Sequence, residues 1–473
     1  MSVAALAAVA AIPALALGAL SVVAQGRVDE GSPPPAPSST VANPVVPMTT
    51  PLLSMRRAPG SLATAKRRDI LSGALGGLIG SVDPSSCMAI GTGRSLVASV
   101  NPTKPVIPAS NLKVIVAAAA ADILGPDTVF TTKVVGAAPV NGVVQGDVYL
   151  VGGGDPVLSE AWYAQPNAVR KRPPLHATSV EALADSLKAA GVTTITGSVV
   201  GDGSRYDDER HPPGWGASVT STGDGVPVGA LVIDDSMTEK GAIAADPTAF
   251  AASAFSDVLK ARGISVRGAS STGAAPSDST TLASIESGKL ADVLNEMLAT
   301  SDNLTAEMMV KEVGLKVAGK GTRVDGLAAI MARVASWGVP TDSFVMDDGS
   351  GLSRTDRVTC TGMLAVLQRG TATDLVGAGM AVAGQAGSTL DGRFQDAGLA
   401  GVLRGKTGSL RGVKALCGYF PAAGGEVQFV LILNGDTATA FAGPWGQLGA
   451  ALLAAAAAPT ADRFAPIGAK AQP

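Results

Sequence analysis

The sequence contains very few histidine and aromatic residues. Only two of its 473 residues are histidines, His176 and His211, and each lies close to a Pro-Pro pair that is typical of a loop. A Ser-His-Asp triad is therefore disfavoured, and a lysine becomes the natural base for an activated serine. Aromatic residues make up 4% of the chain and the formal net charge is -3, so the composition gives no reason to expect a nucleic-acid partner.

Cysteine is also scarce. Cys87, Cys360 and Cys417 are widely spaced and include no metal-ligand pair. One disulfide with one free thiol and three reduced core cysteines are both compatible with this spacing. Cys417 lies in an alternating apolar run, where it is most simply a core side chain.

The N-terminal region combines an apolar segment with a proline-rich one. Residues 3–24 are almost wholly apolar and long enough to span a membrane, whereas no later stretch is. Val22-Val23-Ala24 offers small residues for a signal peptidase, although no Lys or Arg precedes the apolar run. We therefore expect residues 1–24 to be a signal peptide or membrane anchor, residues 25–57 a Pro-rich linker, and the protein to be exported to the cell envelope.

Ser110 and Lys113 form a Ser-x-x-Lys pattern at the start of an apolar run. Residues 114–124 favour helix and Gly125-Pro126 ends the run, which predicts a buried helix with Ser110 on its first turn. Residues three apart share a helix face, so the Lys113 amine can reach the Ser110 hydroxyl. Burial is expected to lower the pKa of Lys113, and a free amine beside a serine activates it as a nucleophile. On its own, this pattern is better explained by a helix cap beside a solvent-directed lysine.

Two further motifs follow in order and change this interpretation. Ser301-Asp302-Asn303 and Lys406-Thr407-Gly408 complete the signature of penicillin-binding proteins and serine β-lactamases. No other serine has a lysine three residues on, and no other lysine precedes Thr-Gly or Ser-Gly. The middle motif is less specific, because Ser99-Val100-Asn101 also fits Ser-x-Asn, but that segment precedes the nucleophile and has the wrong order.

The remaining signals divide the chain into a catalytic region and an insertion. We expect residues 58–160 and 281–460 to form two parts of a transpeptidase-like domain, residues 161–280 to be inserted between them, and residues 461–473 to be a tail. A hairpin is predicted within residues 128–151, before a glycine-rich turn. The insertion repeats a helix, glycine and strand pattern, which predicts a small α+β domain. Lys406 is predicted to lie on an edge strand.

Together these segments resemble the class C, type-4 low-molecular-mass penicillin-binding proteins, the D-alanyl-D-alanine carboxypeptidase/endopeptidase family. The resemblance covers about residues 60–455 and implies an α/β (α+β) fold of the penicillin-binding-protein and serine β-lactamase type, with an inserted α+β region. Besides the catalytic motifs, five segments carry it: Gly-Gly-Asp-Pro at 153–156, Gly-Asp-Gly-Ser at 201–204, Pro-Val-Gly-Ala-Leu at 227–231, Asp-Gly-Ser-Gly-Leu-Ser-Arg at 348–354 and Lys-Thr-Gly-Ser-Leu at 406–410.

The resemblance implies a serine-type D-alanyl-D-alanine carboxypeptidase or endopeptidase that trims peptidoglycan stem peptides. Ser110 would attack the D-Ala-D-Ala carbonyl, Lys113 would take its proton, and Ser301 would help pass it to the departing D-alanine. Asn303 would orient Lys113 and donate to a substrate amide. Backbone N–H groups of Ser110 and Ser409 would form the oxyanion hole. No metal or organic cofactor is implied, and β-lactams are expected to inhibit covalently.

The same resemblance implies the substrate contacts. Lys406, Thr407 and Ser409 would hold the terminal carboxylate, and Gly408 would let the substrate approach the strand. Asp155 and Arg354 would contact the peptide stem.

Two alternatives stay open. One is a serine β-lactamase or esterase, which the long insertion and the lack of a Glu-rich deacylation loop after Ser301 argue against. The other is a noncatalytic envelope protein that binds peptidoglycan.

Overall fold

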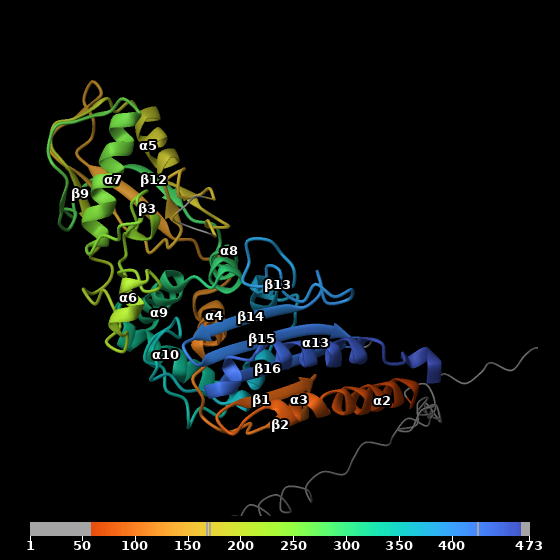
Figure 1. Cartoon of the computed structure of the whole chain (residues 1–473). Coiled ribbons are helices and arrows are strands. Elements are labelled where there is room, and N and C mark those ends of the chain that lie inside the picture. Colours follow the sequence, from red (N-terminus) through yellow and green to blue (C-terminus); the bar gives the residue numbers. More distant parts are fainter. Residues whose placement is uncertain (1–57, 167–168, 170–171, 423–424, 465–473) are drawn as a thin grey trace, which may run out of the picture. The chain divides into compact units, whose positions relative to one another are not determined.

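The computed structural model describes residues 58–166, 169, 172–422 and 425–464. The predicted signal peptide or anchor, the Pro-rich linker and residues 465–473 of the tail lie outside them. The described residues belong to one compact unit, which is built around a six-stranded and a five-stranded β-sheet (Figure 1). No helix of the described part is both long and apolar enough to cross a bilayer.

The six-stranded sheet is antiparallel and has the order β13-β14-β15-β16-β1-β2. Along β1, Cys87 and Ala89 pack into one core, while Met88 and Ile90 pack into another. The central strands therefore bury both faces, which explains their nearly continuous apolar sequences. The strands are β1 (Cys87–Thr92), β2 (Ser95–Val100), β13 (Ala381–Val382), β14 (Arg404–Leu410), β15 (Val413–Ala422) and β16 (Gly425–Asn434).

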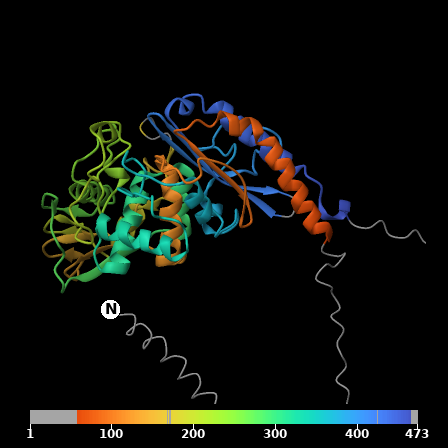
Figure 2. The same ribbon diagram turned by 90° about the horizontal axis from the view of Figure 1, so that it is seen from below.

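Two long helices cover one face of this sheet. α2 (Ala58–Ala74) and α13 (Ala442–Ala456) come from opposite ends of the described chain, contact each other and run side by side along the strands (Figure 2). The short helix α3 (Gly76–Ser81) also contacts α13. Leu71, Leu75 and Leu448 belong to the core that these helices form with the sheet.

The opposite face carries a helical cluster that holds the first two sequence motifs, and the third motif lies on β14 of the sheet. The turn η1 (Ala109–Asn111) leads into the apolar helix α4, which contacts α9, α10 and α11. The helices of this face are α4 (Leu112–Leu124), α8 (Leu290–Asn295), the π-helical turn η3 (Glu296–Thr300), α9 (Asn303–Ala318), α10 (Arg323–Ser336), α11 (Cys360–Leu367) and α12 (Leu375–Gly379).

The inserted region contains the five-stranded sheet, in the order β11-β9-β5-β3-β12, and a short parallel sheet, β10-β8-β4. Helices α5 and α7 pack with the larger sheet around a separate core. The elements are β3 (Thr131–Gly136), β4 (Val143–Val144), β5 (Val148–Val151), β6 (Leu158–Ser159), β7 (Thr178–Ser179), α5 (Val180–Ala189), β8 (Thr194–Ile195), β9 (Val199–Asp202), α6 (Ala217–Ser221), η2 (Asp234–Ser236), α7 (Pro247–Ala261), β10 (Ser265–Val266), β11 (Ser271–Thr272) and β12 (Thr280–Glu286).

The predicted repeat is present in this region. α5 is followed by Gly191 and β8, and α7 by Gly263 and β10; both glycines have positive φ, and the two strands pair in parallel. The predicted hairpin is also present as the antiparallel pair β3 and β5. However, β3 also pairs with β12, and β5 with β9. The predicted boundaries at 160/161 and 280/281 therefore cut through one sheet, which spans residues 131–286 instead.

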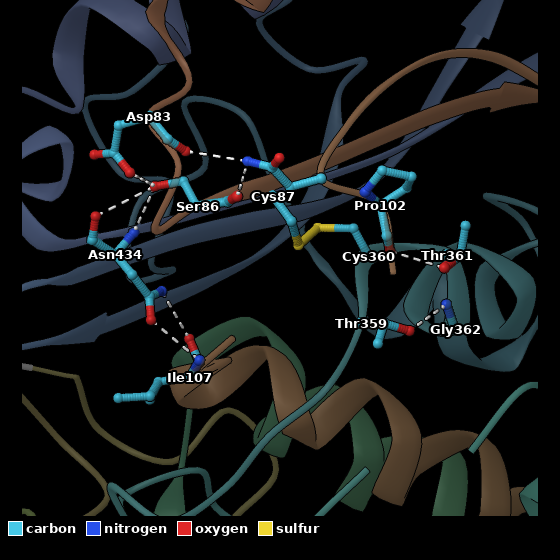
Figure 3. The surroundings of a disulfide bond; sticks show 11 residues. Asp83, Ser86, Cys87, Pro102, Ile107, Thr359, Cys360, Thr361, Gly362 and Asn434 are labelled. Atoms are coloured by element: carbon cyan, nitrogen blue, oxygen red, sulfur yellow. Dashed lines mark hydrogen bonds between the residues drawn. A yellow bond between two sulfur atoms is a disulfide. The ribbon is translucent and has the colours of Figure 1, made fainter. Parts of the chain in front are cut away.

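One disulfide links the six-stranded sheet to a helix on one of its faces. Cys87 on β1 is bonded to Cys360 at the start of α11, so the bond joins a strand to a helix of the motif-bearing face (Figure 3). Cys417 on β15 is a buried free thiol. Of the two cysteine states compatible with the sequence, the structure has one disulfide and one core thiol.

The predicted edge position of Lys406 needs a qualification. β13 lies outside β14 in the sheet, but it pairs only with Arg404 and Gly405. From Lys406 to Leu410, no described strand pairs with the outer side of β14. This part of the strand is thus open to a further strand.

Candidate active site

Ser110 lies in the turn η1, directly before α4, and is half-buried. The preceding Ala109 has a φ of 48°, which is unusual for a residue other than glycine. Left-handed backbone of this kind costs free energy and is frequent at functional sites. The strained turn places the Ser110 hydroxyl at the N-terminal end of the helix that carries Lys113.

Lys113 is fully buried in the first turn of α4, and its amine has three hydrogen-bond acceptors. Nζ lies 3.0 Å from Ser110 Oγ, 2.7 Å from Asn303 Oδ1 and 2.6 Å from the Ser350 carbonyl oxygen. Burial lowers the pKa of Lys113 to about 8, against the opposing charges of Asp348 and Glu307. The predicted reach and direction of the pKa shift are both confirmed, and the amine is poised between base and ammonium forms near neutral pH.

The second motif lies where η3 meets α9. Ser301 has a φ of 69°, and the side chain of Asp302 caps α9 by accepting a hydrogen bond from the Thr305 N–H at 2.6 Å. Asn303 begins the helix, accepts from Lys113 and donates through Nδ2 to the Asp224 carbonyl at 2.8 Å. The second motif therefore combines a helix cap, made by Asp302, with a contact from Asn303 to Lys113.

Lys406 reaches this motif from the sheet. It lies opposite Cys417 in the β14–β15 pair, so both side chains point to the helical face. Its amine is fully buried and donates to Ser301 Oγ and to the Thr407 carbonyl, each at 2.8 Å. Burial, followed by the positive charge of Lys113, lowers the pKa of Lys406 well below its usual value.

Gly408 allows β14 to approach the turn that holds Ser110. A Cβ at this position would lie 2.9 Å from the Pro108 carbonyl oxygen and 3.2 Å from the Ala109 Cβ. A side chain would therefore separate the strand from the turn that holds Ser110. The glycine is needed here for close packing of two protein segments, in addition to any approach by substrate.

A cleft of about 440 Å³ opens over these residues. Ser110, Ser301, Asn303, Thr407 and Ser409 are part of its lining, whereas the buried Lys113 and Lys406 are not. Lys406 would therefore influence a bound carboxylate through Ser301 and through its charge. The structure brings Ser110, Lys113, Ser301, Asn303, Lys406, Thr407, Gly408 and Ser409 together around one cleft.

Asp155 and Arg354 are not among the residues that line this cleft. Asp155 is 2% exposed, accepts a hydrogen bond from the Val157 N–H at 3.0 Å, and burial raises its pKa to about 6. Arg354 is exposed and donates to the Arg411 carbonyl at 2.9 Å. These placements do not support the predicted contacts with a peptide stem.

The glycines before Asp155 do permit close approach, but to the protein itself. Added Cβ atoms at Gly152 and Gly153 would lie 2.4 Å from the Ala230 carbonyl oxygen and 2.1 Å from the Thr131 carbonyl oxygen, respectively. The glycine-rich turn therefore packs against neighbouring backbone within the inserted region.

Several residues that line the cleft belong to no motif that is recognisable in the sequence. Arg172 and Asp224 come from the inserted region, and Arg393 and Lys414 from segments on either side of β14. Lys414 donates to Ser409 Oγ at 2.8 Å and lies 5.0 Å from the centre of the Phe441 ring. No local pattern marks these residues, because tertiary contacts alone bring them to the motifs.

No group of three or more His, Cys, Asp or Glu residues in the described part of the chain is arranged to hold a metal ion. The chemistry that the cleft offers on its own is a serine hydroxyl, two amines of lowered pKa and backbone N–H groups.

The chain matches known proteins over most of its length. The model of the D-Ala-D-Ala carboxypeptidase 3 (S13) family matches residues 87–243 and 239–456. A D-alanyl-D-alanine carboxypeptidase from Actinomadura sp. (strain R39) is 31% identical over 85% of this chain and 87% of its own. Carboxypeptidase DacB from Mycolicibacterium smegmatis is 30% identical over 89% of both chains.

A solved structure supports the predicted fold. The crystal structure of penicillin binding protein 4 (dacB) from Haemophilus influenzae has a TM-score of 0.66 and 22% identity, and the match covers 80% of this chain and 98% of that one. The predicted penicillin-binding-protein fold is therefore confirmed, and with the sequence matches it shows that this chain belongs to the D-Ala-D-Ala carboxypeptidase 3 (S13) family.

Proposed function

We propose that the protein is a serine-type D-alanyl-D-alanine carboxypeptidase that acts on peptidoglycan stem peptides through an acyl-enzyme on Ser110. The observation that carries this proposal is the 3.0 Å contact between Ser110 Oγ and the buried Lys113 amine, at the edge of a cleft that contains all three motifs. Family membership and the names of the relatives support the same activity.

The reaction assigns a task to each motif. The free-base amine of Lys113 takes the Ser110 proton as Oγ bonds to the carbonyl carbon of the D-Ala-D-Ala bond. Backbone N–H groups of Ser110 and Ser409 stabilise the oxyanion, typically by a few kcal/mol per donor. Ser301 passes the proton to the departing D-alanine, and water then hydrolyses the ester. Thr407 and Ser409, which line the cleft, hold the terminal carboxylate of the substrate.

The substrate would lie along β14. The outer side of this strand, from Lys406 to Leu410, is not paired with a described strand, so an extended peptide can add to the sheet. The same cleft would accept a β-lactam, whose acyl group remains on Ser110 if deacylation is slow. A cell-wall substrate places the action outside the cytoplasm, and the Cys87–Cys360 disulfide is typical of an oxidising compartment. Residues 1–24 would provide the export signal or anchor.

The test is the intact mass of the full chain after incubation with benzylpenicillin. We expect an adduct of one drug molecule in the parent and in Ser99→Ala, which changes the Ser-x-Asn serine that precedes the nucleophile. We expect no adduct in Ser110→Ala. Released D-alanine from a peptide ending in D-Ala-D-Ala should show the same pattern.

The alternatives have different outcomes. Rapid consumption of benzylpenicillin without a lasting adduct would instead indicate a β-lactamase. An unmodified parent with surviving drug and no released D-alanine would favour a noncatalytic peptidoglycan-binding protein.

A further inference from the structure

The loop at residues 348–353 lies directly against the nucleophile and the lysine base. Its Ser350 carbonyl oxygen accepts the shortest of the three hydrogen bonds from Lys113, at 2.6 Å. Gly351 has a φ of 80°, and a Cβ there would lie 2.0 Å from the Ala109 carbonyl oxygen and 3.1 Å from the Ser110 nitrogen. The position of this loop therefore helps to fix both the turn of Ser110 and the amine of Lys113.

Two buried carboxylates hold the loop. Glu307, on α9, accepts from the Ser350 N–H at 2.8 Å and from the Gly349 N–H at 3.1 Å. Asp348 accepts from the N–H groups of Gly351 and Ser353, each at 2.7 Å. Glu307 is 2% exposed and Asp348 is 0% exposed, so neither side chain is available to bind substrate directly.

The backbone of one residue, Ser350, connects Glu307 to the base. The Ser350 N–H points to Glu307, and the Ser350 carbonyl points to Lys113. Glu307 also lies four residues after Asn303 on α9, so both residues share a helix face. α9 thus contacts Lys113 directly through Asn303 and indirectly through Glu307 and Ser350.

A third contact secures the loop from the inserted region. Trp215 donates from its indole Nε1 to Asp348 Oδ2 at 2.8 Å. Asp348 therefore accepts hydrogen bonds from both its own loop and the inserted region.

We propose that Glu307 and Asp348 are positioning residues for the general base: they fix the Ser350 carbonyl against Lys113 and provide the negative charge that faces its ammonium form. The inference rests on the proposed role of Lys113 as the base. Both carboxylates already satisfy backbone N–H groups of the loop, and the inference adds to this structural role an effect on the base.

The charges around Lys113 are unequal in their effect. Asp348, Glu307 and Asp302 raise the pKa of Lys113 against the effect of burial, and Lys406 is the neighbouring cation. Burial and the charge of Asp348 raise the pKa of Asp356 to about 10, so Asp356 is protonated at neutral pH. Burial and Asp348 raise the pKa of Glu307 to about 7, so Glu307 is mostly ionised at pH 8.

The test is the pH dependence of acylation by benzylpenicillin in the full chain. Acylation should follow the free-base fraction of Lys113 and rise with pH through about 8 in the parent. Glu307→Gln removes a negative charge, which lowers the pKa of Lys113 and moves this rise to lower pH by about one unit. The misplaced Ser350 carbonyl should also lower the plateau rate by about tenfold to a hundredfold.

Asp356→Asn is the matched control. It replaces a carboxyl group that is already neutral, and Asn keeps the acceptor for the Asp347 N–H, so the rise should stay near pH 8. Asp348→Asn provides a second test from the loop itself, in case Glu307→Gln does not fold, and should also move the rise to lower pH.

Several results would overturn the inference. A lower plateau with an unmoved rise in the Glu307 or Asp348 variant would show that the carboxylates only stabilise the fold. An equal movement in Asp356→Asn would show that the effect is not specific to these two carboxylates. If Ser110→Ala abolishes the adduct while the rise stays unmoved in both variants, the proposed function stands and this inference fails. If Ser110→Ala retains the adduct, the proposed function itself fails.

Discussion

The active-site cleft and the glycine-rich turn of the inserted region both bury a titratable side chain, but they treat it differently. Lys113 is fully buried, hydrogen-bonds to three acceptors and faces several carboxyl groups, which keep its pKa at about 8. Asp155 is also buried, but desolvation dominates and raises its pKa to about 6. Burial shifts both side chains towards their neutral forms, but the shift is limited mainly by opposite charges at Lys113 and by a backbone hydrogen bond from Val157 at Asp155.

The largest expected effect comes from Lys406→Met. The substitution removes the hydrogen bond to Ser301 and the positive charge beneath the cleft, so acylation by benzylpenicillin should slow by about a thousandfold, or about 4 kcal/mol. Removing a buried amine should leave the melting temperature equal or higher. Lys133→Met, on an exposed lysine of β3, is the control and should change neither property. A loss smaller than tenfold would contradict the importance of the lysine pair.

The next effect concerns the disulfide, which joins strand β1 of the six-stranded sheet to helix α11. Replacing Cys87 and Cys360 together by alanine should lower the free energy of unfolding by about 2–4 kcal/mol, because the bond closes a loop of 273 residues. Denaturant unfolding with and without reductant measures this. Cys417→Ala should still respond to reductant, whereas the double variant should not. A parent protein insensitive to reductant would show that the bond contributes little.

Asp155→Asn tests how the burial of Asp155 affects the stability of the protein at different pH values. The pKa of Asp155 is raised to about 6 in the folded state, so the parent loses stability as pH rises from about 4 through 6. The neutral Asn avoids this loss and should stabilise the protein by about 1–3 kcal/mol at pH 8, but not at pH 4. Unfolding at both pH values, with exposed Asp278→Asn as control, measures the difference. A gain that is equal at both pH values would point to packing rather than titration.

The smallest expected effect is that of Arg354→Ala. Arg354 is exposed, bonds to a backbone carbonyl and does not line the cleft, so kcat/KM for a D-Ala-D-Ala peptide should change by less than about threefold. Lys414→Ala is the comparison, since Lys414 lines the cleft and donates to Ser409; we expect about tenfold there. A larger loss of kcat/KM in Arg354→Ala would support the contact between Arg354 and the peptide stem that the sequence predicted.

Much of the local structure could be predicted from residue patterns. The apolar run after Ser110 is helix α4, and Gly191 and Gly263 end helices before short strands. These signals are local, since helix propensity and left-handed glycine depend on a few neighbouring residues. The edges of the inserted region were missed for the opposite reason. The β3–β5 hairpin is visible in the sequence, but nothing local indicates that its strands pair with β9 and β12.

The candidate site shows the same division. The order of three short motifs was enough to predict that Ser110, Lys113 and Asn303 would meet, and they do. It was not enough for Glu307 or Lys414, which carry no motif of their own and reach the site through α9 and β15. Asp155 and Arg354 show the converse, because they belong to recognisable segments yet are not among the residues that line the cleft.

The sequence by itself was enough to propose Ser110 as the nucleophile and Lys113 as its partner, and to identify the second and third motifs and the type of fold, because these depend on residue identity, order and short-range helix geometry. The tertiary structure alone decided the Cys87–Cys360 bond, the contributions of Arg172 and Asp224 to the cleft and the link from Glu307 through Ser350 to Lys113. Each of these joins residues that are far apart in the chain. Such contacts depend on how whole sheets and helices pack, which no single stretch of sequence encodes.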